Sequence, residues 1–267
     1  MTAVIDDPLI AGMVISRELP VHVSSRRLRQ LYPDCPRVYG LAVMADVSKR
    51  RWWPLQAALT TDRLDEMYRA AADEMDSASA AAQQLAAALA HTVIGRAVAL
   101  FVLEGRAWDA GLENLWVHVD SEGVIDWLGI VDPTLRVLPD DACAGERGAV
   151  ALPGEAALAT WLAHRCHRSL APLFARLHAI SGGAVGQASM WHTVGAAVVG
   201  SATQIPLLAG MSEVVAMRRG QAVLDALVGF GLPVRGPLAS RPWVRGSAAV
   251  RRNHAKGLAK LGQPCLC

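Results

Sequence analysis

Apolar positions recur with helical spacing in a long alanine-rich stretch from residue 62 to about residue 103. Alanine has the highest helix propensity, and apolar residues spaced three and four apart predict an amphipathic helix. Thr60-Thr61-Asp62 resembles a helix N-terminus, where a hydroxyl or carboxylate can cap the first turn. Residues 77–79, Ser-Ala-Ser, predict a break, so we expect two consecutive helices here.

A second helical half begins at Pro153-Gly154-Glu155, because proline suits the first turn of a helix. We expect this helix to reach about Ile180, with some bending at Pro172. Two further helices are expected over residues 185–204 and 211–230, separated by Pro206 and Gly210.

Between the helical halves, the pattern changes to β-branched and aromatic residues. Residues 115–119 and 124–130 are separated by Asp120-Ser121-Glu122-Gly123, which predicts a β-hairpin. Residues 134–138 predict a third strand, whereas residues 1–55 predict an irregular or mixed entry. The expected fold class is α+β, predominantly helical with a small antiparallel β-sheet in the middle. We expect an entry segment at 1–60 packed on a main domain at 61–240, followed by a basic segment at 241–267.

The composition indicates a folded protein, since 52% of its 267 residues are hydrophobic and 19% are charged. A net charge of +2 argues against nucleic acid as a general partner. Basic charge is local to the C-terminal part, which has no acid between residues 235 and 260 and contains Arg235, Arg241, Arg245, Arg251, Arg252, Lys256 and Lys260. Such a strip predicts an anionic ligand or the cytoplasmic face of a membrane as partner.

A cytoplasmic location is expected, because acids Asp6 and Asp7 stand where a secretory signal needs basic and apolar residues. The most membrane-like stretch, residues 185–209, is interrupted by polar residues and Pro206, so a buried core helix is expected there. Five cysteines in such a chain are expected to remain reduced.

The candidate metal ligands are Cys265 and Cys267, whose spacing lets both thiolates face one metal ion. Thiolates select iron in clusters, zinc or Cu(I). His254 is the nearest additional ligand in sequence. The alternative is a pair of exposed thiols at a frayed terminus.

This C-terminal stretch resembles that of the FhuF-type ferric-siderophore reductases. That family ends with two adjacent cysteines, about ten residues, and two more cysteines, which together hold a [2Fe–2S] cluster. Arg251-Arg252 stands where the family commonly has arginine, and residues 190–194, Met-Trp-His-Thr-Val, resemble its tryptophan-centred helix. The predicted hairpin is similar to its middle section, so the resemblance covers roughly residues 60–267.

The chain departs from the family pattern at two places. Asn253-His254 replaces the first cysteine pair, and one residue rather than two separates Cys265 from Cys267. The resemblance therefore leaves three options. A cluster is completed by His254 and a distant thiol such as Cys166, a different metal is bound, or the cluster has been lost.

The function that the resemblance implies is one-electron reduction of Fe(III) in a ferric siderophore, with electrons from an external donor. Cys265, Cys267 and His254 would bind the metal. The expected siderophore-binding residues are Arg241, Trp243, Arg245, Arg251 and Arg252, since guanidinium groups bind oxyanions and an indole can stack on a ring. The rivals are a siderophore-binding protein without redox activity and a single-metal protein.

Two other features have structural interpretations. His164-Arg165-Cys166-His167 places two imidazoles on one helix face, but we expect a solvated basic face with Cys166 turned inward. His91, His118 and His192 are expected to be core histidines. Hydrolase and nucleotide-binding signatures are absent from the sequence.

Overall fold

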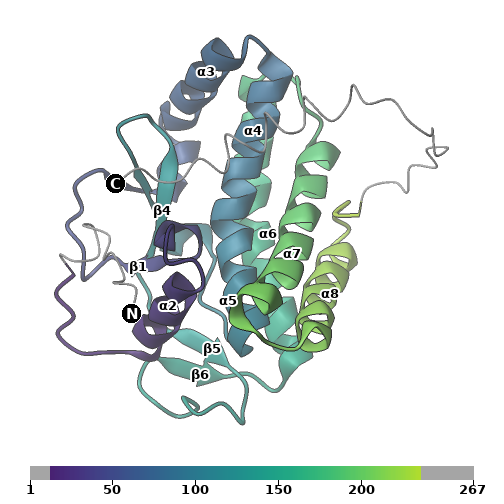
Figure 1. Cartoon of the computed structure of the whole chain (residues 1–267). Coiled ribbons are helices and arrows are strands. Elements are labelled where there is room, and N and C mark those ends of the chain that lie inside the picture. Colours follow the sequence, from purple (N-terminus) through teal and green to yellow (C-terminus); the bar gives the residue numbers. More distant parts are fainter. Residues whose placement is uncertain (1–12, 236–267) are drawn as a thin grey trace.

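The fold comes from a computed structural model that describes residues 13–235, and it confirms the expected α+β class. A group of long helices lies on one side and a small sheet on the other (Figure 1). The helices are α2 (Pro20–Gln30), α3 (Arg63–Met75), α4 (Ala78–Ala90), α5 (Arg96–Glu104), α6 (Glu155–Ile180), α7 (Gln187–Ala209) and α8 (Glu213–Gly229). Short 3-10 turns occur at Pro36–Val38, Leu55–Leu59 and Leu112–Asn114.

The main sheet has four strands in the order β1 (Leu41–Val43), β4 (Ile125–Ile130), β3 (Leu115–Val119) and β2 (Trp52–Pro54). The predicted hairpin is confirmed as β3 and β4. Strand β2 pairs antiparallel with β3, whereas β1 pairs parallel with β4, so the sheet is mixed and the expectation of a purely antiparallel sheet is wrong. The predicted third strand appears as β5 (Leu135–Val137), but it pairs parallel with β6 (Ala149–Ala151) in a separate sheet.

The predicted helices are confirmed in the chain both before and after the β3–β4 hairpin. The alanine-rich stretch contains the expected break, where Asp76 adopts a left-handed conformation and Ser77 caps α4. One π-helical turn, His91–Gly95, joins α4 to α5. The expectation that Pro206 ends α7 is wrong, since the helix continues to Ala209 and ends at the left-handed Gly210. Proline removes only one hydrogen bond there, and it does so in the last turn.

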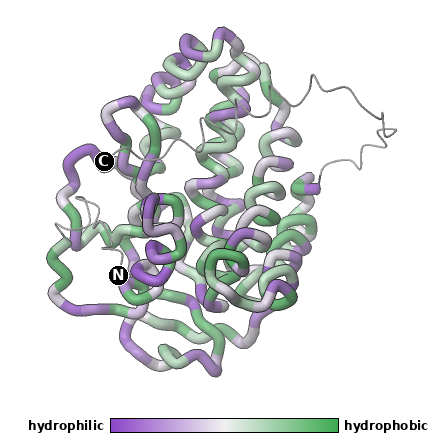
Figure 2. The backbone as a smooth tube through the Cα atoms, in the orientation of Figure 1, coloured by the Kyte–Doolittle hydropathy of each residue, from purple (hydrophilic) through white to green (hydrophobic). Residues whose placement is uncertain are grey.

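The two faces of the sheet are covered differently. Leu115, Val117 and Leu128 belong to the main core that the helices share. The opposite face forms a second, smaller cluster of Ala42, Met44, Trp52 and Trp127. Alternate residues of a strand point to opposite faces, so His118 lies on the side of this smaller cluster. Along the backbone, hydrophobic and hydrophilic residues alternate within the helices, and several outer loops are hydrophilic (Figure 2).

The N-terminal part is more regular than expected. Helix α2 buries one face, but that face contains the polar residues His22, Ser24 and Ser25. Their partners satisfy them, as when the Ser25 hydroxyl donates to the Leu41 carbonyl at 2.7 Å. A buried polar face does not produce an apolar periodicity, which is why the sequence pattern did not predict this helix.

Within the described residues, the helical run Ala78–Glu104 is long and apolar enough to cross a membrane by length and composition. The structure buries 78% of its most apolar window. A helix covered in this way is consistent with the core of a soluble protein.

Candidate functional site

Every site residue predicted from the sequence lies outside the described range 13–235. These residues are Arg241, Trp243, Arg245, Arg251, Arg252, His254, Cys265 and Cys267. Their roles therefore stay predictions. The candidate site that follows is built from the part of the chain that the structure describes.

The three described thiols do not form a metal site with each other. Cys35, Cys143 and Cys166 form no disulfide within the described residues, and no group of three or more metal-ligating side chains lies together between residues 13 and 235. Cys166 is 1% exposed, and burial raises the pKa of its thiol far above the usual value. A thiol that resists ionisation is a poor metal ligand, because the thiolate is the ligating form.

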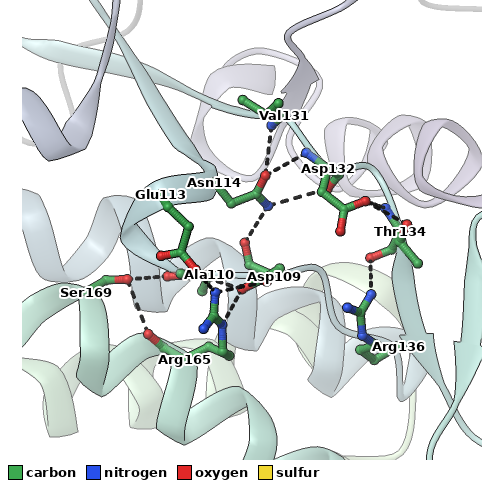
Figure 3. A network of polar contacts seen from close by, with 11 residues as sticks. Asp109, Ala110, Glu113, Asn114, Val131, Asp132, Thr134, Arg136, Arg165 and Ser169 are labelled. Carbon is green, nitrogen blue, oxygen red and sulfur yellow. Dashed lines mark hydrogen bonds and ion pairs between the residues drawn. The ribbon is translucent and has the colours of Figure 1, made fainter.

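The His164–His167 segment of α6 has a structural role, with Cys166 turned inward as predicted. Both imidazoles contact the ring of Phe230, with centroids 5.9 Å apart in each pair. Between them, Arg165 donates hydrogen bonds to both oxygens of Asp109, at 2.6 and 3.0 Å, and also pairs with Glu113. Asn114 continues the same network to Val131 and Asp132 (Figure 3). These contacts tie α6 to the loop before β3 and to the end of β4.

The larger pocket, about 790 Å³, lies between the α3–α4 helix pair and one end of the sheet. Trp53 and Ile125 contribute from strands, Met67 from α3 and Leu85 from α4. Charged side chains around this apolar lining are Arg51, Arg63, Glu66, Glu74, Asp120 and Glu122. The Arg63 guanidinium lies 5.1 Å from the centre of the Trp53 ring. Such an apolar pocket with a few charged groups is typical of small-molecule sites.

A smaller pocket of about 490 Å³ adjoins the larger one and shares Arg51, Asp120 and Ser121 with it. Its other lining residues are Arg37, Ser48, Arg50, His118 and Asp126. Among the described residues, Arg50 and Arg51 form no ion pair, whereas Arg37 and Asp126 pair with each other. The smaller pocket therefore holds an excess of unneutralised positive charge.

Arg51 occupies an unusual backbone conformation. Trp52 N donates to the Lys49 carbonyl at 3.1 Å, which closes a tight turn with Arg50 and Arg51 at its centre. Arg51 has φ of 66°, so this is a type II turn with arginine at the position that normally takes glycine or asparagine. Left-handed conformations of such residues are costly and are concentrated at functional sites.

Asp126 is placed by a second backbone irregularity. His118 pairs with Trp127, and Val119 pairs with Ile125, so Asp126 is an extra residue in a β-bulge. Its Oδ1 lies 2.7 Å from His118 Nδ1, and its Oδ2 accepts from Arg37 Nη1 at 2.8 Å. Bulges often re-aim side chains next to active sites. With Nδ1 bound to the carboxylate, His118 Nε2 has no partner within the described residues.

Arg96, the first residue of α5, binds the backbone of two residues that line the smaller pocket. It is 5% exposed and donates to the carbonyls of Arg37 and Asp126, at 2.7 and 2.8 Å. Burial lowers the pKa of its guanidinium to about 10, against the opposing effect of Asp126. Its Nε and Nη1 are buried without a partner in the described part of the chain. Arg96 thus fixes two pocket residues and leaves its positive charge near them.

The smaller pocket, with three arginines and two acids in its lining, can bind a negatively charged group, and sequence reasoning missed it. The signal was the run of residues 48–53, Ser-Lys-Arg-Arg-Trp-Trp, in which consecutive basic residues precede two tryptophans. The expected core role of His118 is confirmed, since it is 5% exposed and paired with Asp126. The same expectation is wrong for His91, which is exposed, and for His192, which is only partly buried.

The interpretation of the two pockets as a ligand site rests on their geometry alone, because no related protein supports it. Comparisons of the chain with protein-family models, with curated proteins and with solved structures found no match.

Proposed function

We propose that this protein binds a ferric siderophore in the larger pocket and reduces its Fe(III). Support comes from the size and lining of that pocket, since 790 Å³ lies within the range of about 300–1,000 Å³ typical of organic ligands. Trp53 offers aromatic surface, and Arg51 and Arg63 are the two lining groups that attract an anionic chelate, against four lining acids, Glu66, Glu74, Asp120 and Glu122. The resemblance of the C-terminal sequence to the FhuF-type reductases supports the redox role, and such an enzyme would act in the cytoplasm.

The metal centre of this proposal uses residues beyond position 235. Cys265, Cys267 and His254 would hold a [2Fe–2S] cluster, with Arg241, Trp243, Arg245, Arg251 and Arg252 attracting the siderophore. When bound, such a cluster supplies one electron for the conversion of Fe(III) to Fe(II), and an external donor restores it. Cys166 contributes poorly to this donor set, because it is buried in the core.

The second candidate function is siderophore binding without reduction. Its support is Asn253, which replaces a thiolate position with an amide that is not a cluster ligand. In this alternative, the larger pocket keeps its ligand, and the tail binds a single zinc or copper ion or none.

Anaerobic purification distinguishes these functions. The full chain is reconstituted with iron and sulfide, and its visible absorption, iron and acid-labile sulfide are measured. The reductase proposal expects a coloured protein with about two iron and two sulfide per chain, and both are lost in Cys265→Ser and Cys267→Ser. A colourless, sulfide-free protein that still binds a ferric siderophore would support the second candidate instead.

A further inference from the structure

The smaller pocket has the chemistry of a site for a single anionic group. Arg50 and Arg51 both line it, and neither forms an ion pair within residues 13–235. The acids of its lining are already engaged, since Asp126 binds His118 and Arg37, and Asp120 Oδ1 accepts from Glu122 N and Val124 N. Three arginines, Arg37, Arg50 and Arg51, line the pocket against two carboxylates, so a net positive charge remains.

Hydrogen-bonding groups in the pocket add to this charge. His118 is held by Asp126, so its ring orientation is fixed and Nε2 is left to interact with a ligand. The hydroxyls of Ser48 and Ser121 also line the pocket. Guanidinium groups match the geometry of carboxylate and phosphate oxygens and can bind them with two parallel hydrogen bonds.

Two backbone irregularities lie beside this pocket in the sheet. The type II turn places Arg51 directly before β2, and the bulge places Asp126 in β4. Trp52 and Trp127 both pair with His118, so β3 lies between the two irregularities. A left-handed arginine and a β-bulge each cost local free energy. Both occur beside the cavity that the charged side chains line.

We propose that the smaller pocket is an oxyanion site, in which Arg50 and Arg51 bind a carboxylate or phosphate group of a small ligand and His118 completes the contact. Because Arg51 lines both pockets, the rest of that ligand extends into the larger pocket. This inference deepens the proposed function and rests on it for the identity of the ligand as a chelate. It narrows the substrate to chelates with a free carboxylate or phosphate group. The oxyanion site itself requires neither iron nor a cluster.

The test uses the iron-free full chain and two probes, inorganic phosphate and citrate, in calorimetric titrations at constant ionic strength. We expect saturable binding with one site per chain. Arg50→Gln and Arg51→Gln should each weaken it about tenfold or more, because each removes a charged hydrogen-bond donor. Arg147→Gln is the matched control, since Arg147 is exposed, lies in the loop before β6 and forms no ion pair within the described residues.

Arg51→Gly separates binding from folding. Glycine adopts positive φ readily, so this variant should keep or raise the melting temperature while losing as much affinity as Arg51→Gln. Absence of saturable binding by both probes in the wild type, or equal weakening in Arg147→Gln, would overturn the oxyanion site. Neither result bears on cluster content, so this failure can be distinguished from failure of the proposed reductase.

Discussion

Individual side chains in this protein show how similar residue types acquire different roles from their surroundings. Arg165 and Arg96 are both partly or wholly buried arginines, but Arg165 is neutralised by Asp109 and Glu113, whereas Arg96 mainly binds main-chain carbonyls. Arg50 and Arg51 have no such partner in the described structure. Arginines of this last kind are available to bind a ligand.

Cys166 provides a test of the option in which a distant thiol completes a cluster. We expect Cys166→Ala to leave the iron and sulfide content of the reconstituted protein unchanged, because the thiol is buried and its pKa is raised by burial. The free energy of unfolding should fall by roughly 1 kcal/mol from the lost core volume. Metal analysis and urea denaturation measure the two effects. A loss of iron comparable to that in Cys265→Ser would contradict the core role.

The Arg106–Asp141 ion pair predicts a pH dependence at the scale of single residues. Burial alone would raise the pKa of Asp141, but the hydrogen bonds from Arg106, at 2.7 and 2.9 Å, and from Cys143 N result in a lowered pKa. The folded state therefore favours the carboxylate. This contribution to stability is present above the unfolded pKa near 4 and is lost as the pH falls through the lower folded value.

Asp141→Asn should accordingly lower the free energy of unfolding by about 2 kcal/mol at pH 7. The difference from the wild type should shrink between pH 5 and pH 3 as the wild type loses the ionised group. Urea titrations at pH 7, 5 and 3 measure this change. Asp140→Asn is the control, since Asp140 is exposed and forms no ion pair in the described part of the chain. A difference that stays constant with pH would rule out the assigned charge effect.

Secondary-structure elements were predicted well where the local signals are strong. The alanine-rich run was predicted from the spacing of its apolar residues, α6 from the proline at its start, and the β3–β4 hairpin from β-branched and aromatic residues around a turn. Helix α2 was missed, since hydrogen-bonded Ser24, Ser25 and His22 take the place of apolar residues on its buried face. Local patterns report burial of apolar surface and cannot report burial that is made possible by a distant hydrogen-bond partner.

The packing of α7 on α8 predicts opposite effects of two glycine substitutions. A Cβ at Gly220 of α8 would lie 2.6 Å from the Ala202 side chain, whereas a Cβ at Gly200 of α7 would meet nothing within 4 Å. Gly220→Ala should therefore destabilise the protein by about 1–3 kcal/mol through overpacking. Gly200→Ala should stabilise it by up to about 1 kcal/mol, because alanine favours the helix.

Thermal and urea unfolding measure the change in stability of the two variants. Both variants carry the same substitution, glycine to alanine. If Gly220→Ala were as stable as Gly200→Ala, the close approach of α7 and α8 would be contradicted. The comparison also separates packing from propensity, since both glycines lie within helices.

At the scale of the whole molecule, the candidate site depends on how the sheet brings together segments that are far apart in the sequence. Arg37 precedes β1, Arg51 precedes β2, His118 lies in β3 and Asp126 in β4, so the sheet brings four separate segments together. The parallel pairing of β1 with β4 joins residues about ninety positions apart, as in Leu41 with Leu128. No local pattern predicts such a pairing. The basic run before Trp52 was visible in the sequence, but its partners were not.

The π-helical turn His91–Gly95 gives the chain a place that should tolerate a deletion. Its hydrogen bonds span five residues rather than four, so the turn contains one residue more than a regular helix needs. Removing the exposed His91 should let α4 and α5 join as one continuous α-helix with their buried faces kept in phase. The same deletion elsewhere in this helical run would rotate the following face by about 100°. The turn can thus lose a residue while Arg96 keeps its direction toward the sheet.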